Sequence, residues 1–301
     1  MKRILLIVSL LLSFLLQAQK SEFWIPSDTL NPVRRNWVVY GGGGVAVTSL
    51  VGLYTIWYSD YPQSGFHWVN DNANWLWMDK LGHSTTAYFV GEMGYSGLRW
   101  AGVKESQALW YGGLTGWSYL TVVEVMDGLS DGWGFSWGDM TANTLGAALF
   151  IGQQAGWKEQ RIRLKFSYSP TDYPDYAPDL LGKDWTQQWL KDYNGQTYWL
   201  SVNPNSFQVD WMPKWLNVAV GYGADGMIGA SENPLDVNGL DVSNIERKRQ
   251  YYLSLDLDLS RIPVKKPWLR SVFSMINFIK IPAPALEFQE GGGVRFHALY
   301  F

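Results

Sequence analysis

The sequence contains no cysteine in 301 residues, and it has only three histidines. The first absence excludes structural disulfides, thiolate metal sites and an acylated N-terminal cysteine, so we expect any membrane attachment to come from the fold itself. The histidines form no paired metal-ligand motif of the His-x-x-x-His or Glu-x-x-His kind. No basic stripe is present either, and nothing in the charge pattern therefore suggests a nucleic-acid partner.

The first 19 residues have the pattern of a bacterial export signal. Lys2 and Arg3 precede a short apolar run at residues 4–16, and Ala18 supplies a small residue near a cleavage site. The apolar run is short for a membrane span, so we expect residues 1–19 to be removed as a signal peptide.

Residues 20–158 have the pattern of apolar helices. Residues 37–58 carry no charge, have Trp or Tyr at both ends and follow Arg34 and Arg35, as a membrane-spanning helix would. Three weaker apolar segments follow at residues 80–100, 106–126 and 138–156. Together these segments predict a membrane-associated bundle of about four apolar helices.

Residues 159–301 have a different periodicity, in which apolar and polar side chains alternate. The alternation is clear at residues 162–168, 216–222 and 253–260, is weaker at 196–202, and the last segment, 293–301, ends in Phe301. Pro282 and Pro284 mark a loop. This half therefore predicts six to eight antiparallel strands, either a partial or small barrel-like sheet or a sheet packed on the helices. The predicted fold class is α+β.

The aromatic content indicates a membrane location. Aromatic residues make up 16% of the chain, with 18 Trp and 17 Tyr, and many lie at the ends of apolar runs. Trp and Tyr favour the membrane–water interface, although an aromatic core in a soluble protein would have the same composition. We expect a bacterial envelope protein in the outer membrane, or otherwise an inner-membrane protein with a periplasmic β domain. Its expected partners are membrane lipid and other envelope proteins.

Polar residues inside the apolar helices are the candidate site. Three pairs have helical spacing, and each pair can face one interior: Asp79 with His83, Glu124 with Asp127, and Asp139 with Asn143. Charge in apolar helices is expensive, so these residues form either a mutually satisfied network or a reaction site. The catalytic candidates are His83, Asp79, Glu124 and Asp139, and the binding candidates are Lys80, Asp127, Asn143 and Tyr88.

Each candidate also has a simpler interpretation. Asp79 and Asp139 stand where helices begin and could be N-caps. Lys80 could neutralise Glu124 or Asp127, and Tyr88 could be a hydrogen-bonded core aromatic. One imidazole with two or three carboxylates suits Zn, Mn or Fe. Because the histidine is single, however, no metal or other cofactor is predicted.

The same residues carry a family resemblance. Asp79-Lys80-x-x-His83 with Tyr88, Glu124 and Asp139-x-x-x-Asn143-x-x-Gly146 resembles the pattern of VanZ-like membrane proteins. The wider run, with Asp127 and Ser136-Trp137-Gly138-Asp139, more closely resembles YfiM-like envelope proteins of unknown function. The resemblance covers about residues 75–155. YfiM-like proteins are commonly predicted lipoproteins, yet this chain has no cysteine. Asp131-Gly132-Trp133 stands where VanZ-like proteins place an arginine.

Two functions follow from these observations. In the first, the His/Asp/Glu residues form a buried network that fixes helix register, and the protein has a structural or assembly role in the envelope. In the second, they form a membrane-embedded hydrolase-like or lipid-handling site, in which His83 is the acid or base and Asp79 orients it. The sequence leaves open whether the protein is an enzyme.

Overall fold

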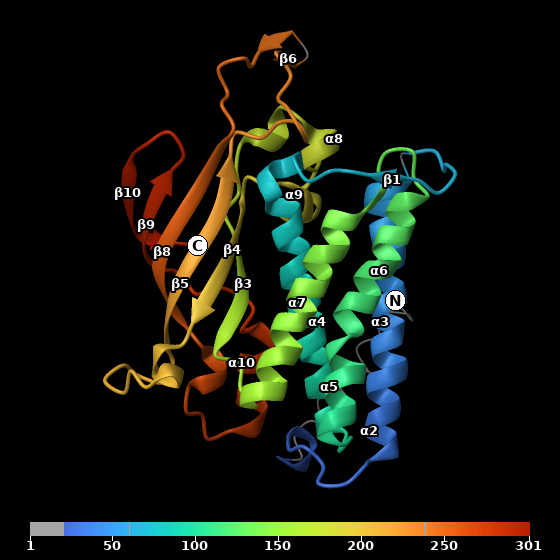
Figure 1. Ribbon diagram of the computed structural model, residues 1–301, viewed down its shortest axis with the longest axis vertical. Helices are drawn as coiled ribbons and strands as arrows, with labels where there is room; N and C mark the ends of the chain where they lie inside the picture. Colours follow the sequence, from blue (N-terminus) through green and yellow to red (C-terminus); the bar gives the residue numbers. More distant parts are fainter. Residues whose placement is uncertain (1–20, 60, 238) are drawn as a thin grey trace, which may run out of the picture.

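The computed structural model describes residues 21–59, 61–237 and 239–301, and the predicted signal peptide at residues 1–19 lies outside the described residues. A layer of long helices lies beside one antiparallel sheet, so helix and sheet both contribute to the fold (Figure 1). The helices come first in the chain and most of the strands follow them.

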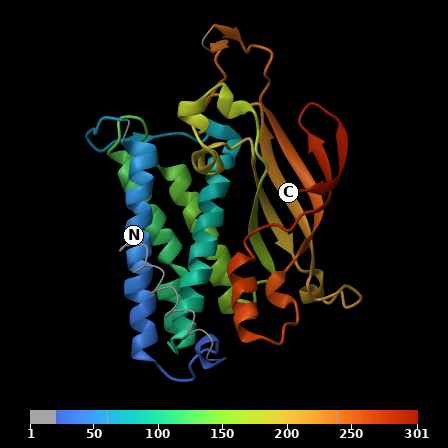
Figure 2. The same ribbon diagram turned by 180° about the vertical axis from the view of Figure 1, so that it is seen from behind.

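The first long helix runs without a break from Pro32 to Tyr58 and includes α2 (Pro32–Asn36) and α3 (Gly42–Leu53). Its start follows from local chemistry, because the Asn31 side chain accepts a hydrogen bond from the Arg34 N–H and Pro32 occupies the first turn. Among the described residues it is the one helix long and apolar enough, by length and composition, to cross a membrane. It lies at the outer edge of the helical layer (Figures 1 and 2).

The central helix is α4 (Met78–Trp100), which packs against the three other long helical elements and against the sheet. Those elements are α5 (Glu105–Gly113), α6 (Thr115–Gly128) and α7 (Trp137–Trp157). The prediction of one helix over 106–126 was wrong, because the chain breaks at Leu114 between α5 and α6. Small residues at the break allow a close approach, since a Cβ on Gly113 would lie 2.8 Å from the Ile151 side chain.

Helices α4 and α7 are in backbone contact. A Cβ added to Gly146 of α7 would lie only 2.0 Å from the carbonyl oxygen of Ser84 in α4. The Ser84 hydroxyl donates a hydrogen bond to the Ala142 carbonyl across the same contact, at 2.8 Å. This contact fixes the relative position of the two helices, and both of them contribute residues to the site described below.

The sheet has six strands in the order β10-β9-β8-β5-β4-β3, all antiparallel to their neighbours. The strands are β3 (Ile162–Tyr168), β4 (Gln196–Val202), β5 (Leu216–Asp225), β8 (Lys248–Leu257), β9 (Ala283–Gln289) and β10 (Val294–Tyr300). Two short ribbons join β1 (Trp68–Val69) to β2 (Phe135–Ser136), and β6 (Asp236–Val237) to β7 (Leu240–Asp241). Short helices complete the fold: α8 (Pro178–Leu181), α9 (Trp185–Lys191) and α10 (Pro267–Ile276).

The sheet does not close into a barrel. Within the described chain its end strands β3 and β10 form no ladder with each other, and residues 278–280 instead lie along β3, through the Phe166–Ile279 bridge. The loop predicted around Pro284 is in fact the start of β9. Proline is tolerated there because the ladder from β8 ends at the Ser254–Ala285 pair, so no N–H is needed at Pro284.

The sheet is inverted, in the sense that it exposes apolar side chains on one face and buries polar side chains on the other, the reverse of a sheet in a soluble protein. Leu200, Val220, Leu253 and Leu286 are register partners across four strands, and they are 41%, 54%, 43% and 37% exposed. The opposite face is buried and carries many polar side chains beside the aromatic pair Trp199 and Tyr252. Lys165, Ser201, Asn217 and Asp256 on that face are fully buried. The alternating pattern in the sequence therefore places its apolar side chains outside and its polar ones inside.

The α4–α7 contact gives a stability prediction. Gly146→Ala should lower the free energy of unfolding by about 1–3 kcal/mol, because the new methyl group must push α7 away from Ser84. Gly152→Ala is the matched control in the same helix, where a Cβ meets nothing within 4 Å. It should be neutral or stabilising by up to about 1 kcal/mol. Thermal or denaturant unfolding in detergent measures both, and equal effects at the two positions would contradict the contact.

Candidate functional site

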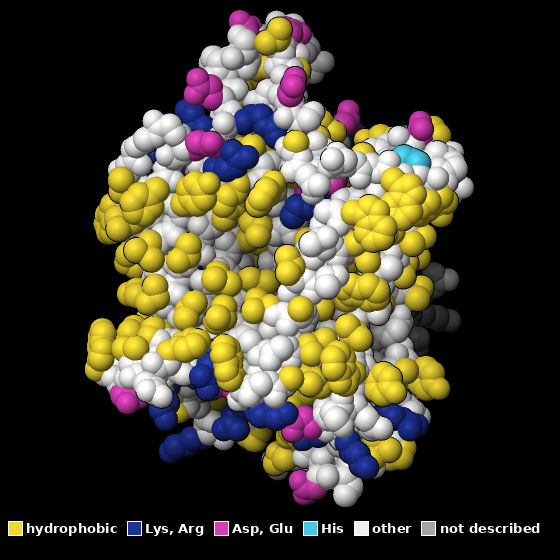
Figure 3. Space-filling view, in the orientation of Figure 1, with side chains coloured by type: hydrophobic (Ala, Val, Ile, Leu, Met, Phe, Trp, Pro, Cys, Tyr) yellow, Lys and Arg dark blue, Asp and Glu magenta, His cyan; other side chains and the backbone are white. Residues whose placement is uncertain are grey.

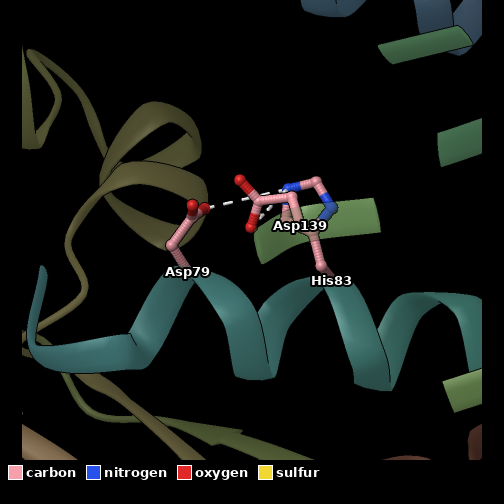
Figure 4. A group of neighbouring side chains, drawn as sticks. All are labelled: Asp79, His83 and Asp139. Atoms are coloured by element: carbon pink, nitrogen blue, oxygen red, sulfur yellow. Dashed lines mark ion pairs between the residues drawn. The ribbon is translucent and has the colours of Figure 1, made fainter. Parts of the chain in front are cut away.

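The predicted polar residues meet at one end of the helical layer, where α4 and α7 begin. Asp79 and His83 project from one face of α4, a turn apart, toward Asp139 in the first turn of α7 (Figure 4). One ligand-type atom from each of the three residues lies within 4.8 Å of the other two. The structure therefore brings together residues from two separate helices, as their helical spacing predicted.

Neither aspartate caps its helix. The N-cap of α7 is Ser136, whose hydroxyl accepts a hydrogen bond from the Asp139 N–H at 3.1 Å. Helix α4 begins at Met78 after a left-handed turn that includes Trp77, and Asp79 already lies inside its first turn. The capping interpretation was thus wrong for both residues, and their carboxylates are left to face the interior.

Lys80 does not neutralise Glu124 or Asp127 as predicted. Its ammonium group is shared by three other carboxylates, those of Asp71 at 2.7 Å, Asp139 at 2.9 Å and Asp79 at 3.3 Å. Sequence reasoning missed Asp71 because it lies in a polar loop with no helical periodicity. Burial by itself would raise the pKa of Asp71, but hydrogen bonds from Lys80 and Ser136 hold this pKa below its ordinary value. Asp71 is therefore ionised near neutral pH and takes up much of the charge of Lys80.

His83 lies at the centre of the group. Its Nδ1 atom is 3.0 Å from Oδ1 of Asn143, a hydrogen bond, and 3.6 Å from Oε1 of Glu124. On the other side of the ring, Nε2 is 3.9 Å from Asp79 and 4.0 Å from Asp139. These two separations are longer than hydrogen bonds.

Two acids from α6 complete the group in different ways. Glu124 is 1% exposed, and one of its oxygens accepts the Ser136 N–H at 3.0 Å. Its other oxygen, Oε1, has no hydrogen-bond partner among the described residues. Asp127 accepts a hydrogen bond from the Tyr58 hydroxyl at 2.7 Å and forms no ion pair with His83 within the described chain. Tyr193 similarly donates to Asp79 at 2.7 Å, and no local pattern in the sequence pointed to either tyrosine.

We call this group the His83 cluster. It is rich in acid, because five carboxylates face one ammonium group and one imidazole. The carboxylates belong to Asp71, Asp79, Glu124, Asp127 and Asp139, and the basic side chains are those of Lys80 and His83. The side chains of Asp79 and His83 are 20% and 14% exposed, so the cluster is largely buried but can be reached from outside.

A second polar cluster lies farther along α4 and has a different balance. Ion pairs there join four acids to four bases, Glu92, Glu159, Asp256 and Asp258 to Arg161, Arg163, Lys165 and Arg261, and the buried Lys280 also lies near Asp256. Arg163 contacts Glu92 at 2.7 Å and Asp258 at 3.2 Å, and a fully buried pair joins Lys165 to Asp256 at 2.8 Å. Tyr88, a predicted binding residue, lies on this side of α4 and donates to Gln160 at 3.0 Å. The structure does not bring Tyr88 into the His83 cluster. We call the second group the Arg163 network.

The Arg163 network should be structural. Arg163→Met should lower the free energy of unfolding by about 3–5 kcal/mol, because it leaves Glu92 and Asp258 with less compensation inside the molecule. Arg270→Met, at an exposed position of α10, is the control and should change stability by less than about 0.5 kcal/mol. Denaturant unfolding of both variants in detergent checks the difference. A network of no structural importance would tolerate both substitutions equally.

The comparisons with known proteins cover the His83 cluster. Residues 65–152 match a family model described as predicted periplasmic lipoprotein (DUF2279), and the matched segment contains the whole cluster apart from Tyr58 and Tyr193. No curated protein and no solved structure matches the chain. The chain itself has no cysteine that could carry a lipid anchor. Over this segment the protein is thus similar to an uncharacterised family of proteins of the bacterial cell envelope.

Proposed function

We propose that this protein is embedded in a membrane of the bacterial envelope, the outer membrane by preference, and that the His83 cluster is an acid–base site for lipid head groups. In this proposal the long helices α3, α4, α6 and α7 form the predicted apolar bundle. The sheet contributes its apolar face to the same lipid contact. The single observation that supports a chemical role is the excess of acid around His83.

The surface supports the membrane part of the proposal. Hydrophobic side chains cover the middle of one face, over the sheet and the helices alike, while charged side chains gather toward the two ends (Figure 3). The apolar row through Leu253 is exposed as well, and Val45 and Val51 of α3 are 71% and 60% exposed. Apolar side chains outside and polar ones inside are the arrangement of proteins whose surroundings are lipid.

Exposed aromatic rings support a position of the His83 cluster at the depth of the lipid head groups. Trp68 and Trp137 stack with ring centroids 5.2 Å apart and are 54% and 66% exposed. Trp137 directly follows Ser136, which contacts both Glu124 and Asp71 in the cluster. Because Trp favours the membrane–water interface, this pair would hold the cluster beside lipid head groups rather than among acyl chains.

The two functions that the sequence left open differ in the charge balance that they require. A buried structural network pairs its charges, as the Arg163 network does with four acids and four bases. The His83 cluster instead keeps five acids against Lys80 and His83, and leaves an oxygen of Glu124 without a hydrogen bond in the described structure. An unbalanced buried group costs stability, and such a cost is typical of residues retained for chemistry. The structural role is therefore assigned to the Arg163 network.

The proposed chemistry is general acid–base catalysis of hydrolysis. His83 would take a proton from a water molecule as that water attacks the head-group ester, and would return the proton to the leaving oxygen. Asn143 holds Nδ1 of the ring, and the carboxylates of Asp79 and Asp139 lie on the Nε2 side. Lys80 lies beside Asp79 and could bind the negative charge of a head group.

The membrane location gives the first prediction of this proposal. Leu253→Lys places a charge in the middle of the apolar row, which costs about 2–4 kcal/mol at the bilayer midplane. The variant should therefore be recovered in the membrane fraction in a smaller share than the wild type. Glu232→Lys, at an exposed position outside the strands, is the control with the same new residue. Equal recovery of both variants and the wild type from membranes would contradict lipid contact at Leu253.

The chemical role is tested with vesicles made from an extract of bacterial envelope lipids. Purified protein should release head groups that mass spectrometry detects, and His83→Gln should reduce the rate by about 100-fold, since a positioned acid–base group contributes about 10²–10⁴. Arg270→Met should leave the rate unchanged. If the wild type releases no more than vesicles without protein, the acid–base function is wrong for these lipids.

A further inference from the structure

We infer that Asp79, His83 and Asp139 together bind a divalent transition-metal ion. This inference goes beyond the proposed function and gives the same cluster a different role, because an imidazole whose Nε2 binds an ion cannot accept a proton at that atom. The three residues offer one imidazole nitrogen and two carboxylate oxygens, and one such atom from each lies within 4.8 Å of the other two.

The distances fit an ion better than they fit direct contact. Nε2 of His83 is 3.9 Å from Oδ1 of Asp79 and 4.0 Å from Oδ1 of Asp139, too far apart for hydrogen bonds in either tautomer. Two ligand atoms that are each about 2.0–2.2 Å from one ion can lie up to about 4 Å apart. The two nitrogen–oxygen separations are thus at the upper end of what one metal ion spans, and a small inward rotation of the carboxylates would bring the three atoms to bonding distance.

Neighbouring groups orient the ligands as metal sites require. Nδ1 of His83 lies 3.0 Å from the Asn143 side-chain oxygen, so Nδ1 donates there and Nε2 is the ring atom that faces the two carboxylates. A hydrogen bond from the far nitrogen of a ligating histidine is the usual way in which proteins fix this tautomer. The Tyr193 hydroxyl likewise donates to Asp79 at 2.7 Å and orients its carboxylate.

A separate observation points to a missing cation. The Glu124 side chain is 1% exposed, and its Oε1 atom lies 3.6 Å from the His83 ring without any hydrogen-bond partner among the described residues. Buried polar atoms are nearly always satisfied, so an unsatisfied carboxylate oxygen beside His83 indicates a ligand at this place.

The charge of the cluster favours the same ligand. Lys80 is already shared among Asp71, Asp79 and Asp139, and no ion pair in the described chain joins it to Glu124 or Asp127. A doubly charged ion would offset two of the uncompensated carboxylates at once. One nitrogen with two carboxylate oxygens suits Zn²⁺, Mn²⁺ or Fe²⁺, whereas Mg²⁺ and Ca²⁺ prefer oxygen ligands alone.

Calorimetric titration of the chelator-treated full-length protein in detergent tests the site, with Zn²⁺ and Mn²⁺ as the probes. The wild type should bind one ion per chain. His83→Gln and Asp79→Asn should each weaken binding by at least about 10-fold. Glu232→Gln, at an exposed position outside the cluster, is the control. Its affinity should stay close to that of the wild type.

A variant that is expected to strengthen metal binding tests whether loss of the fold explains the weaker binding of the other variants. Lys80→Gln removes a competing cation 2.9 Å from Asp139 and should tighten Zn²⁺ binding, whereas general damage to the cluster would weaken it. Circular dichroism verifies that each variant is folded. Absence of binding by the wild type at millimolar metal, or equal binding by wild type and His83→Gln, would overturn the inference.

The experiments can show that the metal site is wrong without overturning the proposed function, and the reverse. If chelated protein still releases lipid head groups and no metal binds, the metal site is wrong while the acid–base function stands. If one ion binds through His83 and Asp79 but no head group is released, the metal site stands and the lipid chemistry is wrong.

Discussion

Charge that is withdrawn from water has to be compensated inside the molecule, and this constraint governs both polar clusters of the protein. The Arg163 network meets it with equal numbers of acids and bases, including the fully buried pair of Lys165 and Asp256. The His83 cluster meets it only in part, since Lys80 is divided among three carboxylates and Glu124 keeps an unsatisfied oxygen within the described structure. The free-energy cost of the His83 cluster has to be offset by the rest of the fold.

The inverted sheet supplies the setting for that compensation. Its polar face compensates charge between its own strands, since Lys165 of β3 pairs with Asp256 of β8, and Arg163 on the edge strand β3 reaches Glu92 of α4 and links the two halves of the chain. Helix α4 therefore carries Glu92 in the Arg163 network toward one end and His83 in the acid-rich cluster toward the other. The close contact of Gly146 with Ser84 then holds Asp139 and Asn143 of α7 against His83. Packing, charge pairing and site geometry in this protein thus depend on the same helix.

Much of this arrangement could be predicted from the sequence, where spacing alone was sufficient. The i, i+4 pairs predicted that Asp79 and His83 share one helix face, and strict alternation predicted the strands around Leu253. The sequence could not supply contacts that depend on tertiary structure. Asp71 lies in a loop, and Tyr58 and Tyr193 arrive from distant segments, so no local period marks them. The β9 strand was missed because Pro284 indicates a loop unless the end of its ladder is known.

The central claim is that the two buried clusters differ in kind, and one pair of isosteric substitutions tests it most directly. The free energy of unfolding in the presence of chelator should be unchanged or higher for Glu124→Gln, which removes a buried carboxyl group with an unsatisfied oxygen from the His83 cluster. For Asp256→Asn, which breaks the balanced pair with Lys165, it should fall by about 3–5 kcal/mol. A comparable loss of stability in both variants would contradict the account and would make the His83 cluster a second structural network.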